Sequence, residues 1–253
     1  MAEGNVAESS RVARDRSASR GGANAAAGGA TMLGAGPAEP QAMDAHRVQR
    51  RRQLLDAAIR VMQRTGYHEM SMQALADEAQ VSVGLAYRYF RGKEDVLLAA
   101  ILDILDALRA ELPEAAAIRG TAADRLCAAF AAYVRVIDRY RDAVLLTYRE
   151  SATLSREGRD RIKELEVSTA APLMSIVEAG IAGGEFGDCD VELAVYDMVL
   201  LAHGWALKYW LFARTRDVEQ YIGAQCRTIL RSLGCADLAA AGRAVTDRAV
   251  TDH

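Results

Sequence analysis

The sequence predicts an all-α fold. Hydrophobic residues make up 51% of the 253 residues and aromatic residues only 6%, and the abundant Ala, Leu and Arg favour helix. Apolar residues recur at three- and four-residue spacing in one segment after another, without the alternation that is typical of strands. Capping residues, Gly and Pro divide these segments into nine predicted helices. They cover 47–65, 71–79, 82–90, 94–112, 121–140, 143–151, 155–181, 190–213 and 217–233.

The first three predicted helices are closely spaced. The helix over 47–65 carries an apolar stripe and ends at a glycine, which suits the C-terminus of a helix. Ser71 and Ser82 precede the next two helices, where we expect each hydroxyl to cap the first turn. The dipeptide Gln80-Val81 forms the tight turn between them. Two short helices joined by such a turn predict a helix-turn-helix, whose second helix enters the DNA major groove.

The other six predicted helices form a longer body. We expect Pro113 to end the helix over 94–112 and Pro172 to kink the helix over 155–181, because proline lacks the backbone N–H group. The strongly apolar helix that begins after Asp190 is expected to continue without a break to residue 213. Capping boxes are expected at Thr121 with Asp124, and at Asp217 with Gln220.

Composition divides the chain into four parts. Residues 1–45 are rich in Ala, Gly and Ser and show no apolar periodicity, which predicts a disordered tail. Residues 46–93 form the predicted helix-turn-helix domain. Residues 94–235 form the predicted six-helix body, and residues 236–253 a predicted flexible tail.

Charge is distributed unevenly along the chain. Residues 47–93 hold nine Lys and Arg against four acidic residues, whereas residues 94–253 hold 18 against 25. A basic module on an acidic body is typical of a protein that presents one face to phosphate groups. The longest apolar candidate for a membrane span, residues 193–212, is interrupted by Asp197 and Lys208. The sequence therefore predicts no membrane-spanning helix.

Other function classes leave no pattern in the chain. Its four cysteines are scattered and have no partner at metal-ligand spacing, so we expect reduced thiols in a cytoplasmic protein rather than a disulfide or a metal site. No nucleophile–histidine arrangement, phosphate-binding glycine loop or carboxylate pair stands out. The sequence predicts neither an enzyme nor a bound cofactor. The cysteines are Cys127, Cys189, Cys226 and Cys235.

A specific motif follows the first predicted helix. It reads Leu-Ala-Asp-Glu-Ala-Gln-Val-Ser from Leu75, then Val-Gly-Leu, then Ala-Tyr-Arg-Tyr-Phe, and Lys-Glu from Lys93. Residues 47–97 thus resemble the DNA-binding domain of the tetracycline-repressor (TetR) family. The signature of that family has Gly where this chain has Gln80, which asks a non-glycine residue for a left-handed conformation. It has Leu where this chain has Ala86, so some packing is lost.

The resemblance implies a set of DNA contacts. Tyr87 and Lys93 are expected to contact phosphate, and Tyr89 sugar or phosphate, whereas Gln73 and Arg88 are expected to contact base edges. Ser71 and Ser82 would add phosphate contacts at the starts of their helices. The tripeptide Val83-Gly84-Leu85 would contact thymine methyl groups or fit the shape of the groove. The run from Arg50 to Arg52 would contact the minor groove or phosphate. The alternatives are a packed aromatic cluster for the tyrosines and a solvated surface for the arginines. The predicted set is Arg50, Arg51, Arg52, Ser71, Gln73, Ser82, Val83, Gly84, Leu85, Tyr87, Arg88, Tyr89 and Lys93.

The body is expected to bind a small molecule and a second copy of the chain. In the family, a ligand between the middle helices tilts the helix after the DNA-binding domain, here 94–112, and the last two helices form the dimer. The apolar faces of the last two predicted helices are too rich for one exposed side, although intrachain packing is an alternative for many of these residues. Structural core is likewise the alternative for the pocket candidates, which combine apolar walls with few polar groups. They are Phe130, Tyr133, Tyr148, Arg149, Met174, Val177, His203 and Trp205.

The predicted function is that of a homodimeric, cytoplasmic, TetR-like repressor. It would bind a palindromic double-stranded DNA operator and be released by a small hydrophobic effector. The segment from Leu145 to Ser151, with 155–182, is similar to family members that sense fatty acyl-CoA thioesters, and another hydrophobic ligand is the alternative. A ligand-independent DNA-binding or architectural protein is the alternative function.

Overall fold

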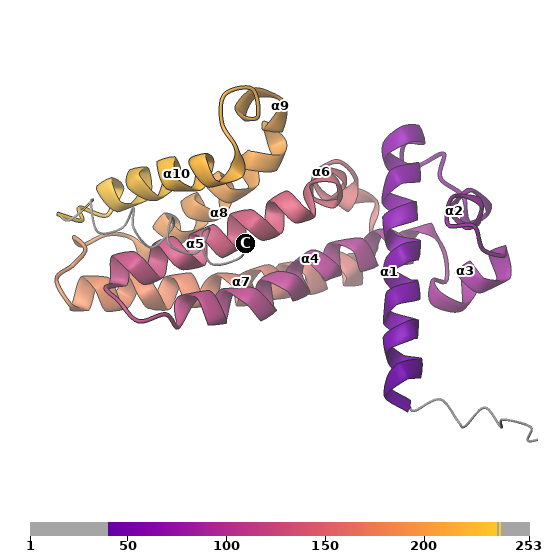
Figure 1. Ribbon diagram of the computed structural model, residues 1–253, viewed down its shortest axis with the longest axis horizontal. Coiled ribbons are helices and arrows are strands. Elements are labelled where there is room, and N and C mark those ends of the chain that lie inside the picture. The colour runs from indigo at the N-terminus through magenta and orange to yellow at the C-terminus, as the bar shows by residue number, and fades with distance from the viewer. Residues whose placement is uncertain (1–39, 237, 239–253) are drawn as a thin grey trace, which may run out of the picture. The chain divides into compact units, whose positions relative to one another are not determined.

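The computed structural model describes residues 40–236 and 238, and these fold into helices alone (Figure 1). Within them there are ten α-helices and one short 3-10 helix, and no strand. The all-α prediction is therefore confirmed. The predicted tails lie outside the described residues over 1–39 and 239–253.

Three helices form the N-terminal domain: α1 (Pro40–Thr65), α2 (Met72–Glu78) and α3 (Val83–Tyr89). The first helix begins at Pro40 rather than at residue 47, and proline is favoured at the first helical position because its missing N–H group is not needed there. The predicted caps are confirmed. The Ser71 hydroxyl accepts from the Ala74 N–H at 3.0 Å, and the Ser82 hydroxyl accepts from the Leu85 N–H at 3.2 Å.

The turn between α2 and α3 is closed by a residue in the left-handed region. Gln80 has a φ of 55°, and it is the one non-glycine residue with positive φ among those that the structure describes. The Gln80 N–H donates to the Asp77 carbonyl and the Val81 N–H to the Ala76 carbonyl, which satisfies the end of α2. The prediction of a strained turn is thus confirmed. This conformation costs roughly 1–2 kcal/mol for a residue with a Cβ atom.

Seven helices and a short 3-10 helix form the body. Helices α4, α5, α7 and α8 pack side by side around its core (Figure 1). The predicted capping boxes at Thr121 and Asp217 are present. The elements are α4 (Lys93–Ala116), α5 (Ala122–Arg139), α6 (Arg141–Glu150), η1 (Ser151–Thr153), α7 (Arg156–Ala182), α8 (Val191–Leu207), α9 (Tyr209–Phe212) and α10 (Val218–Ser232).

Two predicted helix ends are wrong. Pro113 lies inside α4, which continues to Ala116, because burial of Leu112 and Ala115 against the core offsets the backbone hydrogen bond that proline cannot donate. The predicted helix that continues to residue 213 is broken at Lys208 into α8 and α9. The short helix after this break packs Phe212 against an aromatic cluster, and periodicity alone does not reveal such a contact.

One helix among the described residues, α7, is long and apolar enough to cross a membrane by length and composition. It packs against α4, α5 and α8, and it buries Leu173, Ile176 and Val177 in the core that these helices share. We therefore interpret α7 as a core helix of the body.

Side chains of α1 connect the two domains. The Arg51 guanidinium lies 2.8 Å from the Asp103 carboxylate on α4 and also over the Phe90 ring. Arg52 lies over the ring of Tyr140, which links α5 to α6. A displacement of α4 would therefore act directly on α1, to which α2 and α3 are attached.

Candidate nucleic-acid interface and ligand pocket

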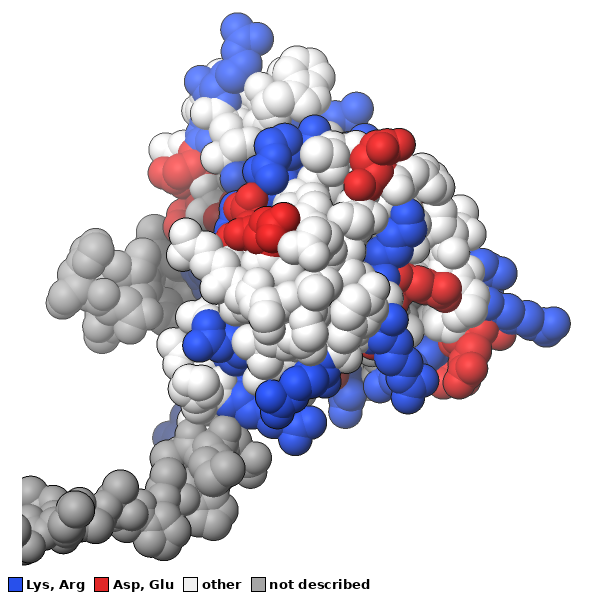
Figure 2. Space-filling model, turned by 90° about the vertical axis from the view of Figure 1, so that its right-hand side faces the viewer, with Lys and Arg blue, Asp and Glu red and all other residues white. Residues whose placement is uncertain are grey.

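The face of the molecule that carries α2 and α3 is bordered by basic side chains. Figure 2 shows this face with uncharged side chains at its centre and Lys and Arg side chains along its lower edge, while Asp and Glu side chains lie among the basic ones elsewhere. A surface with cations at its border suits a DNA duplex, because the cations meet phosphates while the centre reaches the groove.

The packing of α3 decides which of its side chains point outward. Ala86 and Phe90 are buried against the core and hold the helix in place. Tyr87 is 55% exposed and Arg88 is exposed beside it, whereas Tyr89 is half-buried. Ser82 and Gly84 at the start of the helix are exposed, and Val83 and Leu85 are half-buried. The start and outward side of α3 are thus free to contact base edges and phosphates.

Three of the predicted DNA-binding cations are already engaged within the chain. The Lys93 ammonium donates to the carbonyl of His68 at 2.8 Å and lies over the Tyr67 ring, so it braces α4 against the loop before α2. Arg51 and Arg52 are turned toward the body, as described above. For these three residues, DNA contact stays a prediction that competes with an observed structural role.

The other predicted residues before α3 are exposed or half-buried on α1 and α2. Arg50 donates to Gln53, and the Gln73 amide donates to Asp77 at 2.8 Å, which leaves the Gln73 oxygen as an acceptor. Ser71 is exposed at its cap position. A bidentate contact of Gln73 with adenine would first require its bond to Asp77 to break.

The structure also brings together residues that the sequence reasoning left out. His46 and Arg47, in the first turns of α1, line a hollow of about 470 Å³ with Arg88 and Tyr89 of α3. Arg47 lies at the predicted start of the helix, three residues before the arginine run, and the structure places it beside α3. Two arginines at one hollow favour a phosphate contact there.

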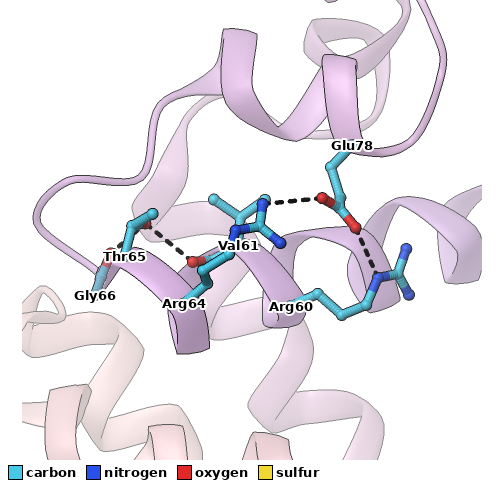
Figure 3. Close-up of polar contacts among 6 residues, drawn as sticks. All are labelled: Arg60, Val61, Arg64, Thr65, Gly66 and Glu78. Atoms are coloured by element: carbon cyan, nitrogen blue, oxygen red, sulfur yellow. Dashed lines mark hydrogen bonds and ion pairs between the residues drawn. The ribbon is translucent and has the colours of Figure 1, made fainter.

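An ion-pair network fixes α2 on α1 (Figure 3). The Glu78 carboxylate accepts from Arg60 at 2.9 Å and from Arg64 at 3.0 Å, and Figure 3 shows both arginines reaching it from α1. These hydrogen bonds hold the pKa of Glu78 below its usual value. The network sets the angle at which α2 and α3 leave α1.

Substitution of Gly84 by Ala separates stability from DNA binding. A Cβ atom at this helical position meets no atom within 4 Å, so Gly84→Ala is expected to raise the free energy of unfolding by about 0.5–1 kcal/mol. If α3 approaches DNA closely at Gly84, the same methyl group weakens DNA binding. Thermal unfolding and fluorescence anisotropy with DNA measure the two effects. Unchanged DNA affinity in a more stable variant would remove Gly84 from the interface.

The body contains a cavity of about 510 Å³ whose exposed lining surface is mainly apolar. Helices α4 to α8 all contribute to its wall, as expected for a pocket among the middle helices. The apolar lining consists of Ile101, Ile104, Leu105, Leu108, Val144, Ile162, Val199 and Leu200; the polar lining consists of Tyr133, Thr147, Tyr148, Ser151, Arg159, Lys163, Glu166, Tyr196 and His203.

Three of the predicted pocket residues meet in this cavity, and the other five do not line it. Tyr133, Tyr148 and His203 contact one another there. Phe130, Val177 and Trp205 are buried in the core, where the indole N–H of Trp205 donates to Asp138. Met174 is half-buried against the core and Arg149 is exposed. An aromatic residue on an apolar helix face gives the same sequence pattern whether it lines a cavity or packs in the core. The sequence therefore did not distinguish cavity residues from core residues.

His203 is held between two tyrosines. Its Nδ1 atom lies 2.7 Å from the Tyr148 hydroxyl, and its Nε2 atom lies 3.4 Å from the Tyr133 hydroxyl. Burial lowers the pKa of His203 to about 4, so the imidazole is neutral at pH 7. Burial also raises the pKa values of both tyrosines and of Glu166. Tyr133, Tyr148 and the His203 imidazole are therefore uncharged at neutral pH.

The low pKa of His203 makes stability depend on pH in a defined direction. As the pH falls below about 6.5, His203 becomes protonated in the unfolded chain. In the folded chain it stays neutral until the pH approaches its pKa of about 4. The free energy of unfolding should therefore fall between these pH values, by about 2–3 kcal/mol from this residue. Glu166 acts in the opposite direction, because its pKa is raised. Urea unfolding of wild type and His203→Gln across this range isolates the histidine; parallel pH profiles would contradict the prediction.

Comparisons with known proteins agree with this geometry. Residues 54–100 match the profile of bacterial regulatory proteins of the tetR family, and residues 119–210 match that of a tetracyclin repressor-like C-terminal domain. The HTH-type transcriptional regulator HbdR of Aromatoleum sp. (strain CIB) is 34% identical over 174 residues, which cover 69% of this chain and 76% of that protein. A fatty acid metabolism regulator protein of Bacillus subtilis (strain 168) is 27% identical over 56% of this chain and 74% of its own length.

A solved structure has the same helical arrangement. A bacterial regulatory protein in the tetR family from Rhodococcus RHA1 superimposes with a TM-score of 0.68 and 26% sequence identity, over 74% of this chain and 98% of that chain. The likeness extends through both the helix-turn-helix and the body.

Proposed function

Because this chain belongs to the TetR family of bacterial transcriptional regulators, we propose that it is a repressor that binds a palindromic operator as a homodimer and is released by a small hydrophobic effector. The observation that carries the DNA-binding part is the exposed side of α3, where Tyr87 and Arg88 project beside a serine-capped helix start. Serine hydroxyls, backbone N–H groups and a guanidinium suit phosphate and base-edge contacts.

The apolar exterior of α8 and α9 supports a homodimer. Leu193 and Leu200 lie seven residues apart on α8 and are 61% and 60% exposed, and Trp210 on α9 is 66% exposed. A face of this kind is stabilised when a second copy covers it about a twofold axis. Leu211 on α9 is 44% exposed and adds to this face, whereas the apolar side of α10 packs within the chain. Tyr221, Ile229, Leu230 and Leu233 are buried in its own core.

The cavity in the body supports an effector with an apolar portion. Its size of about 510 Å³ suits a small organic ligand. Arg159 and Lys163, one turn apart on α7, place positive charge at its wall, as an anionic headgroup requires. The Bacillus subtilis relative is a fatty acid metabolism regulator protein. An acyl thioester of coenzyme A combines an apolar chain with an anionic headgroup, and we propose it as the effector class.

The path from effector to DNA runs through α4. Ile101, Ile104 and Leu108 of this helix line the cavity, and Asp103 on the same helix holds Arg51 of α1. An effector that displaces α4 would therefore move α1 together with the helix-turn-helix. In a dimer this changes the separation of the two α3 helices away from the ~34 Å that successive major-groove half-sites require. We place this regulator in the cytoplasm, where DNA and coenzyme A thioesters are both available.

The experiment that tests this function is a binding isotherm by fluorescence anisotropy at fixed salt. It compares DNA from upstream of the gene for this protein with scrambled DNA, and wild type with Tyr87→Ala. We expect wild type to bind the upstream DNA selectively and Tyr87→Ala to lose about tenfold or more in affinity. Addition of decanoyl-CoA should release the DNA. If both DNAs bind equally and with the same salt dependence, a selection from random sequences follows. The proposal would be contradicted if that selection also yields no palindrome.

A ligand-independent regulator gives a different outcome in the same assay. Selective operator binding that no acyl-CoA of any chain length alters, with no thermal stabilisation by those ligands, would support that alternative. A general architectural protein would bind both DNAs equally.

A further inference from the structure

Tyr133, Tyr148 and His203, at the polar centre of the cavity, have one more donor hydrogen than the hydrogen bonds between them require. A neutral imidazole offers one N–H donor and one acceptor nitrogen, and each tyrosine offers one hydroxyl hydrogen. Tyr133, Tyr148 and His203 therefore hold three hydrogens between them. The two contacts that join them, Tyr148 to Nδ1 and Tyr133 to Nε2, use two of these hydrogens. Whichever nitrogen is protonated, one hydroxyl hydrogen has no acceptor within the trio.

The two distances indicate which hydroxyl this is. The contact of 2.7 Å between Tyr148 and Nδ1 has the length of a hydrogen bond donated by a hydroxyl. Tyr148 then donates to Nδ1, and the proton on Nε2 faces the Tyr133 oxygen at 3.4 Å. The hydrogen of the Tyr133 hydroxyl remains. Tyr133 is only 3% exposed and lines the cavity, so a molecule within the cavity is well placed to accept this hydrogen.

The charges around Tyr133 select a neutral acceptor. Glu166 lines the same cavity. The pKa of Tyr133 is raised, mainly by burial of its hydroxyl and further by the negative charge of Glu166. The neutral His203 supplies no positive charge. Lys163 is paired with Asp160 at 3.3 Å, and Arg159 donates to the Leu154 carbonyl. A carboxylate beside Tyr133 would thus meet the negative charge of Glu166, whereas a carbonyl oxygen accepts a hydrogen bond without bringing charge.

We propose that Tyr133 donates a hydrogen bond to a neutral carbonyl oxygen of the effector. The cavity then prefers an apolar ligand that carries a thioester, ester or ketone over an equally long ligand without the carbonyl, and over a free fatty carboxylate. This inference rests on the proposed function, because it specifies the ligand of the same cavity. His203 and Tyr148 act as positioning residues that orient the Tyr133 hydroxyl.

The test uses ligands that differ at the carbonyl alone. Decanoyl-CoA is compared with its thioether analogue, S-decyl-CoA, by calorimetric titration of the full-length protein, and 2-decanone and decanoate are titrated alongside. We expect wild type to bind the thioester roughly 5- to 15-fold more tightly than the thioether, the effect of one hydrogen bond. Tyr133→Phe should abolish this preference, so that the thioester and the thioether bind with equal affinity.

An infrared measurement separates donation from a structural role. With a ¹³C-labelled carbonyl, the stretching band of the bound ligand should lie at lower wavenumber than in water-free solvent, and Tyr133→Phe should reverse the shift. Tyr221→Phe is the matched control. It removes another buried hydroxyl, which donates to the Leu201 carbonyl at 2.6 Å and does not line the cavity. This control should keep both the band position and the ligand preference.

Each outcome has a defined meaning. Equal affinity for thioester and thioether, or a band that Tyr133→Phe leaves in place, would overturn the inference. A protein that binds its operator but none of the carbonyl ligands would overturn it too, while the DNA-binding function stands. Carbonyl-dependent binding that does not release DNA would support the inference and contradict release by this effector. Binding of 2-decanone in place of decanoyl-CoA would identify a ketone as the carbonyl source.

Discussion

Leu200→Glu is expected to convert the protein to a monomer and to weaken operator binding by about 100-fold or more. Leu200 is 60% exposed at the centre of the apolar face of α8. In a twofold dimer it is buried in both copies, so the substitution removes two apolar contacts worth roughly 1.5–3 kcal/mol each. It also buries two carboxylates without partners, which adds to the loss. A monomer reads a single half-site, and the affinity contributed by the second is lost.

Light scattering gives the mass of the variant, and anisotropy without effector gives its operator affinity. The measurement is made without effector because Leu200 also lines the cavity. Val167→Glu is the matched control, since Val167 is 59% exposed on α7, outside the proposed face. It should remain dimeric and bind the operator normally. A Leu200→Glu protein that keeps the dimeric mass would place the dimer contact elsewhere.

Gly180→Ala is expected to lower the free energy of unfolding by roughly 2–4 kcal/mol, although alanine is the better helix former. A Cβ atom at Gly180 would lie 2.2 Å from the Phe186 ring. The ring cannot easily move, because the Phe186 N–H donates to the Gly180 carbonyl at 3.1 Å and the side chain is buried. The methyl group must therefore displace a large side chain from the core.

Urea unfolding measures this effect, and the double variant identifies its cause. If the clash with Phe186 is responsible, Gly180→Ala should cost little in a Phe186→Ala background, because the two substitutions are coupled. Gly187→Ala serves as a control, since a Cβ atom there meets its nearest atom at an ordinary 3.6 Å. A full loss of stability in both backgrounds would show that the ring is not the obstacle.

Local signals predicted much of the fold. Ser71, Ser82, Thr121 and Asp217 cap their helices as expected, because a cap depends on residues within one turn. The left-handed conformation of Gln80 was expected from the resemblance to the TetR signature, which has Gly at this position of the turn. These features need no knowledge of distant parts of the chain.

Tertiary packing accounts for the differences. Pro113 stays within α4 because its neighbours are buried, and α8 ends early where aromatic packing begins. In the body, His203 was a pocket candidate, but its placement between Tyr133 and Tyr148 joins three helices that are far apart in the sequence. Lys93 was assigned to phosphate through the family resemblance, and Arg51 was assigned to DNA as part of the arginine run in the first helix. Their intrachain partners Asp103 and His68 lie too far away in the sequence to be anticipated.

In the proposed dimer, the position of Leu200 would link effector sensing to the concentration of the regulator. The same side chain lines the cavity and is exposed on the proposed dimer face. A ligand that changes how this side chain sits in the cavity also changes the surface offered to the second copy, and thermodynamic linkage makes that influence mutual. The effector concentration at half response should then depend on how much regulator the cell contains. A repressor that limits its own synthesis would thereby adjust its own sensitivity.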